Sequence, residues 1–481
     1  MDDRIAAQQA EWQASAQPVT GQEALRRGAP AVALAVVSGV ALVAAVGVIV
    51  YLLGRGGPVA GGGPAPGPAS PSASQPTPTP TVPPWAVVYG SSLGDGFNSV
   101  ALAPDGSVIA VGDTGSSEPS GGDALVVKIR PDGSLAWAKT YGGSHVDLFN
   151  AVAIAPDGGI IAAGWTMSAD GDFPGSGGQN AVVARIDPDG SLAWARTSGG
   201  SGDGFTSVAV ASDGSIIAAG NTQSAGGDFP VAKGDQDAVL AKINPDGSLA
   251  WARAYGGSGA DQFDSVTVGP DGGIVAAGYT GSTNGDFPIT EGVNDGVVAR
   301  IDPDGSLAWG KAYGGLDWGK DYGDRGVDYF NSVAVAPDGS VVVGGLSMLL
   351  DEASKTDAVM IRLSADGGLV WGKTYSGSDV SGFYSVAVAS DGNILAAGGS
   401  DGGDALVAKI DTDGSLAWAR TYGGSGGDGF SSIAVAPDGG IIAAGTTNSP
   451  DGDFPDTHDA DSEYLYSDAV VARLTADGSL T

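Results

Sequence analysis

The chain has 481 residues, of which 82 are glycine, none is cysteine and only two are histidine, His145 and His458. Without cysteine there is no disulfide framework, iron–sulfur centre or thiol nucleophile, and two histidines argue against a His-based triad or a multi-His metal centre. Asp and Glu total 55 against 22 Lys and Arg, and the resulting net charge of −33 opposes binding to nucleic acid.

The first 84 residues are interpreted as a membrane anchor. A short N-terminal segment, 1–28, precedes an uncharged apolar run at 29–53. A helix of that length spans about 37 Å, enough to cross a hydrocarbon core of about 30 Å. The alternative is a cleaved signal peptide, whose apolar core is usually only about 7–15 residues long. Three arginines before the run, against one shortly after it, predict a cytoplasmic N-terminus.

Residues 54–84 are rich in Pro, Gly, Ser and Thr, a composition typical of an extended linker. We expect a stalk that holds the rest of the chain away from the membrane. The whole negative charge follows it, because residues 1–84 contain four acids and four bases. The absence of cysteine fits a bacterial exterior. We therefore expect a single-pass cell-membrane protein with an acidic extracellular domain.

Residues 85–481 consist of seven copies of one unit of about 57 residues. A tryptophan marks each copy, at Trp85, Trp137, Trp194, Trp251, Trp309, Trp371 and Trp418. A phenylalanine recurs in step, at Phe97, Phe149, Phe205, Phe263, Phe330, Phe383 and Phe430.

One unit shows four apolar runs, at 265–268, 273–278, 296–301 and 306–313. Such runs of Val, Ile and Ala predict strands that are covered on both faces. An Asp-Gly pair follows the first and the third run in every unit, which predicts two tight hairpins. The connection between the second and third strands is longer, and a fourth connection leads to the next unit.

Seven four-stranded antiparallel units predict an all-β fold, a seven-bladed β-propeller over 85–481. A linear solenoid or a row of separate sheets is the alternative. We expect residues 478–481 to end mid-way through a fourth strand, whereas 85–89 is a fourth strand without a third. Pairing the two ends would complete the last blade and remove its exposed edge. We expect each repeat tryptophan to be largely buried beside its own hairpin.

The string YGGSGADQFDSVTVGPDGGIVAAGYTGSTNGDFP at 255–288 resembles the bacterial SBBP-type β-propeller repeat. The resemblance covers nearly all of 85–481 and implies a propeller, with little information on activity. The hairpin IDPDGSLAW at 301–309 is similar to the tryptophan hairpin of quinoprotein-like propellers and to the Asp box of sialidases. It differs from both in spacing, since Gly305 stands four residues before Trp309, so neither chemistry is carried over.

In an antiparallel sheet, successive connections lie at opposite ends of the strands. The two Asp-Gly turns of each unit are therefore expected on one face of the propeller, which we call the turn face. The longer connections are expected on the other face, which we call the loop face. Repeated acids lie on the loop face. In six units an Asp stands two residues before the repeat Phe. It either accepts backbone N–H bonds that fix the crossing loop, which is the connection from one unit to the next, or lines a cation-binding opening on the loop face. These residues are Asp95, Asp147, Asp203, Asp261, Asp328 and Asp428.

Further acids precede a repeated Phe-Pro and supply part of the oxygen set that Ca²⁺ requires. The calcium candidates are Asp170, Asp172, Asp228, Asp286, Asp451 and Asp453. No other cofactor is indicated. An acidic loop at 455–468 contains His458 and is either a metal site or, more simply, a solvated loop.

The connection after Trp309 contains a local duplication, WGKAYG followed by WGKDYG. It places Trp318, Lys320, Tyr322 and Arg325 on the loop face. Aromatic side chains beside charges suit contact with a sugar or a protein. A duplication that has drifted without a function is the alternative.

These patterns favour a non-catalytic module for recognition, adhesion or scaffolding at the cell surface, with a protein or glycan partner and a monomeric propeller. The rival is an extracellular hydrolase or lyase acting on carbohydrate, and a third possibility is a sensor head. The acids repeat from unit to unit, whereas a catalytic site needs unique residues in one place. The regularly placed bases of the third and fourth strands are expected to pack or form ion pairs within their hairpins.

Overall fold

The computed structural model describes residues 82–90, 94–115, 121–173, 175, 178–224, 226–230, 232–289, 293–314, 326–349, 356–375, 380–454 and 467–480. Over these ranges no helix is long and apolar enough to cross a bilayer. The N-terminal segment 1–28, the apolar run 29–53 and most of the stalk 54–84 lie outside them.

Seven four-stranded antiparallel sheets, the blades, follow one another along the described chain. Blade 1 consists of β2 (Gly96–Leu102), β3 (Val108–Asp113), β4 (Ala124–Ile129) and β5 (Leu135–Tyr141). Blade 2 consists of β6 (Asp147–Ile154), β7 (Ile160–Thr166), β8 (Asn180–Ile186) and β9 (Leu192–Ser198). Blade 3 consists of β10 (Gly204–Val210), β11 (Ile216–Thr222), β12 (Asp237–Ile243) and β13 (Leu249–Tyr255).

The later blades repeat this order. Blade 4 consists of β14 (Asp261–Val268), β15 (Ile274–Thr280), β16 (Asp295–Ile301) and β17 (Leu307–Tyr313). Blade 5 consists of β18 (Gly326–Val335), β19 (Val341–Leu349), β20 (Thr356–Leu363) and β21 (Leu369–Tyr375). Blade 6 consists of β22 (Val380–Val388), β23 (Ile394–Ser400), β24 (Ala405–Ile410) and β25 (Leu416–Tyr422). Blade 7 consists of β26 (Asp428–Val435), β27 (Ile441–Thr447), β28 (Asp468–Leu474) and β1 (Trp85–Tyr89).

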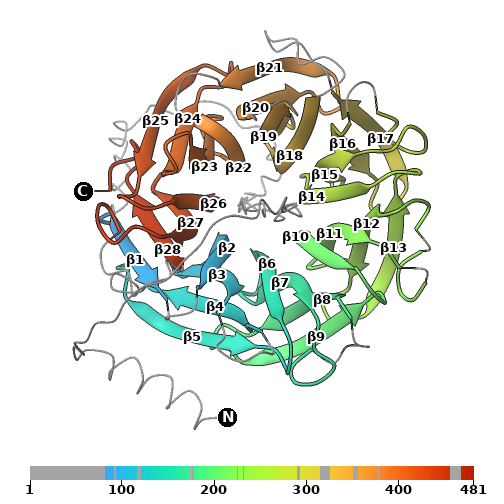
Figure 1. Cartoon of the computed structure of the whole chain (residues 1–481), viewed down its shortest axis with the longest axis horizontal. Helices are drawn as coiled ribbons and strands as arrows, with labels where there is room; N and C mark the ends of the chain where they lie inside the picture. Colours follow the sequence, from blue (N-terminus) through green and yellow to red (C-terminus); the bar gives the residue numbers. More distant parts are fainter. Residues whose placement is uncertain are drawn as a thin grey trace, which may run out of the picture. The chain divides into compact units, whose positions relative to one another are not determined.

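The blades form a closed ring (Figure 1), with the first strand of each blade nearest the centre. Each first strand contacts the first strand of the next blade, and β26 of blade 7 contacts β2 of blade 1. β1 pairs with β28, with Trp85 opposite Arg473 and Tyr89 opposite Ala469. The N-terminal strand therefore completes the last blade, and the predicted seven-bladed propeller is confirmed.

The Asp-Gly pairs form the tight turns of the predicted hairpins. In blade 2, Gly158 has a φ of +87°, and its N–H donates to the carbonyl of Ala155 at 2.8 Å. The carboxylate of Asp157 accepts the N–H of Gly159 at 3.1 Å. Glycine is suited to the left-handed position, and the aspartate satisfies the turn N–H groups, which explains why the pair recurs.

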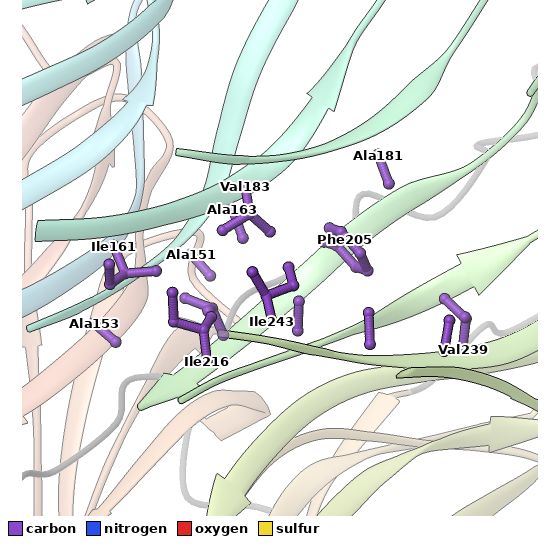
Figure 2. Packing of buried hydrophobic residues seen from close by; sticks show 14 of the residues in the cluster. Ala151, Ala153, Ile161, Ala163, Ala181, Val183, Phe205, Ile216, Val239 and Ile243 are labelled. Atoms are coloured by element: carbon purple, nitrogen blue, oxygen red, sulfur yellow. The ribbon is translucent and has the colours of Figure 1, made fainter. Parts of the chain in front are cut away.

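The hydrophobic core lies between adjacent blades. Between blades 2 and 3, Val183 and Ile161 of one sheet meet Phe205 and Ile216 of the next (Figure 2). Both faces of each sheet are covered in this way, which is why the strand sequences are almost continuously apolar. Many alanines at the interface allow the sheets to approach closely.

The repeat tryptophans depart from our expectation, because they are half-buried and reach the next blade. The indole Nε1 of Trp137 donates to the carbonyl of Pro188 in blade 2, at 3.2 Å, and that of Trp371 donates to the carbonyl of Thr412 in blade 6, at 3.1 Å. The fourth strand is the outer edge of its blade, so its own sheet cannot cover the indole ring of the tryptophan. A hairpin of the neighbouring blade covers part of the indole instead.

In six blades the base of the third strand forms an ion pair with the first turn of its own blade. Lys128 pairs with Asp105 at 2.9 Å, and Arg362 pairs with Asp338 at 2.9 Å. The base is largely buried and the acid is exposed in both pairs. The acid lies in the turn of the other hairpin, so these bases act within their blade and not, as predicted, within their own hairpin. Because the acid of each pair is exposed to solvent, such a pair stabilises the fold by only about 1 kcal/mol or less. On the fourth strand of blade 2, Arg196 pairs with Asp228 of blade 3 at 2.8 Å.

Candidate functional site

The repeated acids before the phenylalanines hold the crossing loops in place. In blade 2, Asp147 is fully buried, and its carboxylate accepts the N–H of Gly143 and the hydroxyl of Ser168, each at 2.8 Å. The hydroxyl of Thr166 donates to its other oxygen. Equivalent bonds surround Asp203, Asp261 and Asp428. These contacts support the loop-fixing interpretation of the repeated acids.

The calcium candidates of blade 2 contact the same crossing loop. Asp170 accepts the N–H of Ser144 at 2.8 Å, and Asp172 accepts the N–H of Gly142 at 3.2 Å. The bond from Ser144 holds the pKa of Asp170 below its usual value. In blade 7 the loop is built the same way, with Asp451 and Asp453 accepting the N–H groups of Ser425 and Gly423.

The other two calcium candidates have basic partners. Asp228 pairs with Arg196 at 2.8 Å, and Asp286 pairs with Lys233 at 2.7 Å. No group of three or more potential ligand side chains with metal-binding geometry occurs in the described ranges. The calcium site stays a prediction. If it is correct, a chelator should lower the melting temperature of the full chain and Ca²⁺ should restore it, whereas equal melting would remove the idea.

The predicted ligand loop after Trp309 lies outside the described residues. Trp318, Lys320, Tyr322 and Arg325 therefore have no structural description here. The same holds for most of the acidic loop at 455–468, including His458.

A different set of side chains stands out once the strands are aligned. Three positions are less regular than the rest of the unit and carry different side chains in different blades: the residue before the repeat Phe, the residue after it, and the residue between Gly and Thr or Ser at the end of the second strand. We call these positions the inner rim, because they lie on the two innermost strands at the ends that lead into the loop face (Figure 1). Their larger members are Asp113, Leu148, Trp165, Asn221, Gln262, Asp264, Tyr279, Tyr329, Leu346 and Tyr384.

The inner rim joins neighbouring blades. Gln262 lies opposite Tyr279 in blade 4, and Tyr329 lies on the first strand of blade 5. The rings of Tyr279 and Tyr329 meet edge to face with centroids 5.0 Å apart. Asn294 donates to the hydroxyl of Tyr329 at 3.2 Å. Both rings are partly exposed, so this junction presents an aromatic pair with polar neighbours.

A chain of amides leads into the same junction. Gln223 donates to Gln236 at 3.1 Å, Gln236 donates to Gln262 at 3.0 Å, and Gln262 donates to the carboxyl group of Asp264 at 2.5 Å. The four residues come from blades 3 and 4. Blade 2 has Gln179 at the position of Gln236, but the full set of four residues occurs once in the described part of the ring. Sequence reasoning missed it because attention went to what repeats, although positions that vary within a regular repeat were the available signal.

Two carboxyl groups of the inner rim have raised pKa values. Asp264 is only 6% exposed, and burial raises its pKa to about 7. Burial, together with the negative charge of Asp95, raises the pKa of Asp113 to about 6. A carboxyl group with a pKa near 7 can exchange protons at neutral pH. The two groups lie on blades 4 and 1, so they do not form an acid–base pair.

These features define the class: the chain is a β-propeller repeat protein. A family model described as "Domain of unknown function (DUF5122) beta-propeller" matches residues 155–192, 211–249, 269–307 and 336–369. Each matched stretch contains the second and third strands of one blade, in blades 2 to 5. No match was found among curated proteins.

Several solved structures are similar. The WD40 β-propeller domain of Doa1 is 13% identical with a TM-score of 0.45, covering 80% of this chain and 95% of that one. Sqt1 from Chaetomium thermophilum is 12% identical with a TM-score of 0.44, covering 75% and 81%. A putative 6-phosphogluconolactonase from Bacteroides uniformis is 14% identical with a TM-score of 0.41, covering 70% and 88%. At this level the likeness concerns the fold alone.

Proposed function

We propose that this chain is a membrane-anchored, extracellular recognition module of the bacterial cell surface, which binds a protein or glycan without catalysis. The inner rim carries the proposal. The repeated acids serve the loops, whereas the non-repeating aromatic and amide side chains gather where blades 3, 4 and 5 meet. A surface built from unique residues on a rigid ring is suited to selective binding.

The placement at the membrane rests on the sequence. The apolar run 29–53 and the arginines before it support a single span with the N-terminus in the cytoplasm. The resemblance to SBBP-type repeats also supports a surface location. The net charge of −33 argues against nucleic acid and in favour of neutral or basic partners.

An extracellular carbohydrate-active enzyme is the second candidate, and Asp264 is the observation that favours it. Its pKa of about 7 is in the range of a general acid or base. Yet the side chain is buried and bonds to Gln262, and the other inner-rim carboxyl group with a raised pKa, Asp113, lies on blade 1. Loss of a hydrolytic activity in Asp264→Asn, with binding retained, would favour this candidate.

Topology is tested on intact cells that express the full chain. External protease should cleave within the 54–84 stalk and release the propeller. Release in the absence of protease, with a new N-terminus near the start of the stalk, would instead indicate a cleaved signal peptide. Protection of the propeller until the cells are lysed would place it inside the cell and contradict the proposal.

Recognition is tested with the detergent-solubilised full chain on immobilised glycans and surface proteins. Tyr279→Ser combined with Tyr329→Ser should abolish a specific interaction, because it removes the partly exposed aromatic pair. Leu416→Ser is the matched control and should bind normally, because Leu416 is 37% exposed at the start of β25, on the turn face. Binding that is unaffected by the tyrosine variant would remove the inner rim from the recognition site.

A further inference from the structure

We propose that two equivalent grooves on the turn face bind neutral saccharides. They lie at the junctions of blades 5 and 6 and of blades 1 and 2, at the opposite ends of the strands from the inner rim. The inference therefore adds a second surface to the proposed function and does not depend on the loop face.

The groove between blades 5 and 6 has a volume of about 540 Å³ and is open to solvent. Its apolar part is formed by Trp371 and Val370 of β21. Its polar part is formed by Arg362 and Asp338 of blade 5 and by Asp413 from the turn of blade 6.

The groove between blades 1 and 2 has a volume of about 470 Å³ and the same construction. Trp137 and Ala136 correspond to the tryptophan and valine, Lys128 to the arginine, and Asp105 and Asp189 to the two acids. The two cavities are therefore built from the same positions of the repeat. In both, a half-buried tryptophan borders the space between the turns of adjacent blades.

The lining suits a sugar ring. The indole nitrogen of Trp371 is occupied by the carbonyl of Thr412, so the remaining exposed part of the ring is apolar. Val370 is 58% exposed beside it. Saccharides present C–H faces that pack on aromatic rings and hydroxyl groups that donate to carboxylates. Asp338, with a side chain 63% exposed, offers such an acceptor at the edge of the groove.

The charges argue against an anionic ligand. Arg362 is paired with Asp338 at 2.9 Å, so its positive charge is already compensated. Hydrogen bonds from Ser340 and Ser415 lower the pKa values of Asp338 and Asp413 respectively, so both are ionised at neutral pH. An anionic ligand would be repelled by these acids and by the net charge of the chain.

Each groove is shallow, so a single site should bind weakly, while two sites on one rigid ring can act together. Avidity of this kind raises affinity by about 10²–10⁴-fold when both sites engage one polymer. We therefore expect the full chain to bind an immobilised neutral polysaccharide strongly and the corresponding free monosaccharide weakly.

The test uses the full chain in detergent on an array of neutral, anionic and cationic oligosaccharides. At least one neutral saccharide should bind, and Val370→Arg or Ala136→Arg should each weaken binding at least tenfold by filling one groove. The double variant should abolish binding. Val293→Arg is the matched control, because Val293 is 51% exposed and lies on the loop face.

Binding to no neutral saccharide would overturn the inference, as would neutral binding that survives the double variant. Equal loss in Val293→Arg would also overturn it and would direct attention to the loop face. The first two results do not bear on the inner rim, which is tested separately by the Tyr279 and Tyr329 variants.

Discussion

Asp264 occupies a position at which four other blades place a hydrogen-bond donor. Asn98 and Asn150 donate to the carbonyl of the next blade's repeat phenylalanine, at 3.1 and 2.8 Å. Thr206 and Asn331 do the same, at 2.6 and 3.0 Å. An ionised carboxylate has no proton to donate, so the blade 4 residue can play this part only when it is protonated.

We predict that Asp264→Asn stabilises the chain at alkaline pH and has little effect at acidic pH. Burial raises the folded-state pKa of Asp264 to about 7, above its unfolded value. Its favourable contribution is therefore fully present below about pH 4 and is lost as the pH rises through 7. At about 1.4 kcal/mol per pKa unit, the change is on the order of 4 kcal/mol.

The measurement is the unfolding midpoint of both proteins at pH 5 and at pH 8. The unfolding midpoint of Asp264→Asn should exceed that of the unmodified chain by more at pH 8 than at pH 5, because asparagine supplies the hydrogen-bond donor at every pH. Asn331→Asp is the matched control and should introduce a pH dependence of the same sign into blade 5. A gap that is equal at both pH values would contradict the assignment.

At the scale of strands, serines connect the innermost strands of neighbouring blades. The hydroxyl oxygen of Ser265 in β14 accepts the N–H of Val333 in β18 at 2.9 Å, and equivalent serines make five further connections around the ring. Blade 2 carries Ala151 at this position, opposite blade 3. The inner strands are thus joined through side chains because they do not pair through their backbones.

We predict opposite effects for two substitutions at this position. Ser265→Ala should lower the free energy of unfolding by about 1–3 kcal/mol, because it leaves the buried N–H of Val333 without this acceptor. Ala151→Ser should raise it by about 0.5–1.5 kcal/mol by supplying the connection to Val208. Denaturant titration of the full chain measures both. Destabilisation by Ala151→Ser would show that blade 2 has no room for the hydroxyl group.

At the scale of the whole molecule, one strand closes the ring. β1 pairs with β28 over its full length, and Trp85 donates to the carbonyl of Pro131 in blade 1 at 3.0 Å. The ring of Tyr89 packs edge to face on Phe97, with centroids 5.9 Å apart. The closing strand therefore stabilises both blade 7 and its junction with blade 1.

We predict that deleting residues 85–89 lowers the stability of the full chain by on the order of 5 kcal/mol, because it removes a large aromatic residue together with a strand. That is comparable with a typical total of about 5–15 kcal/mol. The exposed edge of β28 should also promote association. Thermal melting and light scattering measure the two effects, with deletion of 66–70 in the stalk as control. A stable monomer would mean that the ring does not depend on β1.

The sequence by itself determined the seven blades, their hairpins and the strand that closes the ring. These features depend on local signals, such as the Asp-Gly turns and the apolar runs, and sevenfold repetition makes each signal unmistakable. Tertiary structure alone decided which side chains touch across the junctions between blades. Trp371 reaches Thr412 of the next blade, and Tyr279 meets Tyr329 across a junction. Contacts between blades depend on how sheets pack around the ring, and no local pattern in the chain encodes that geometry.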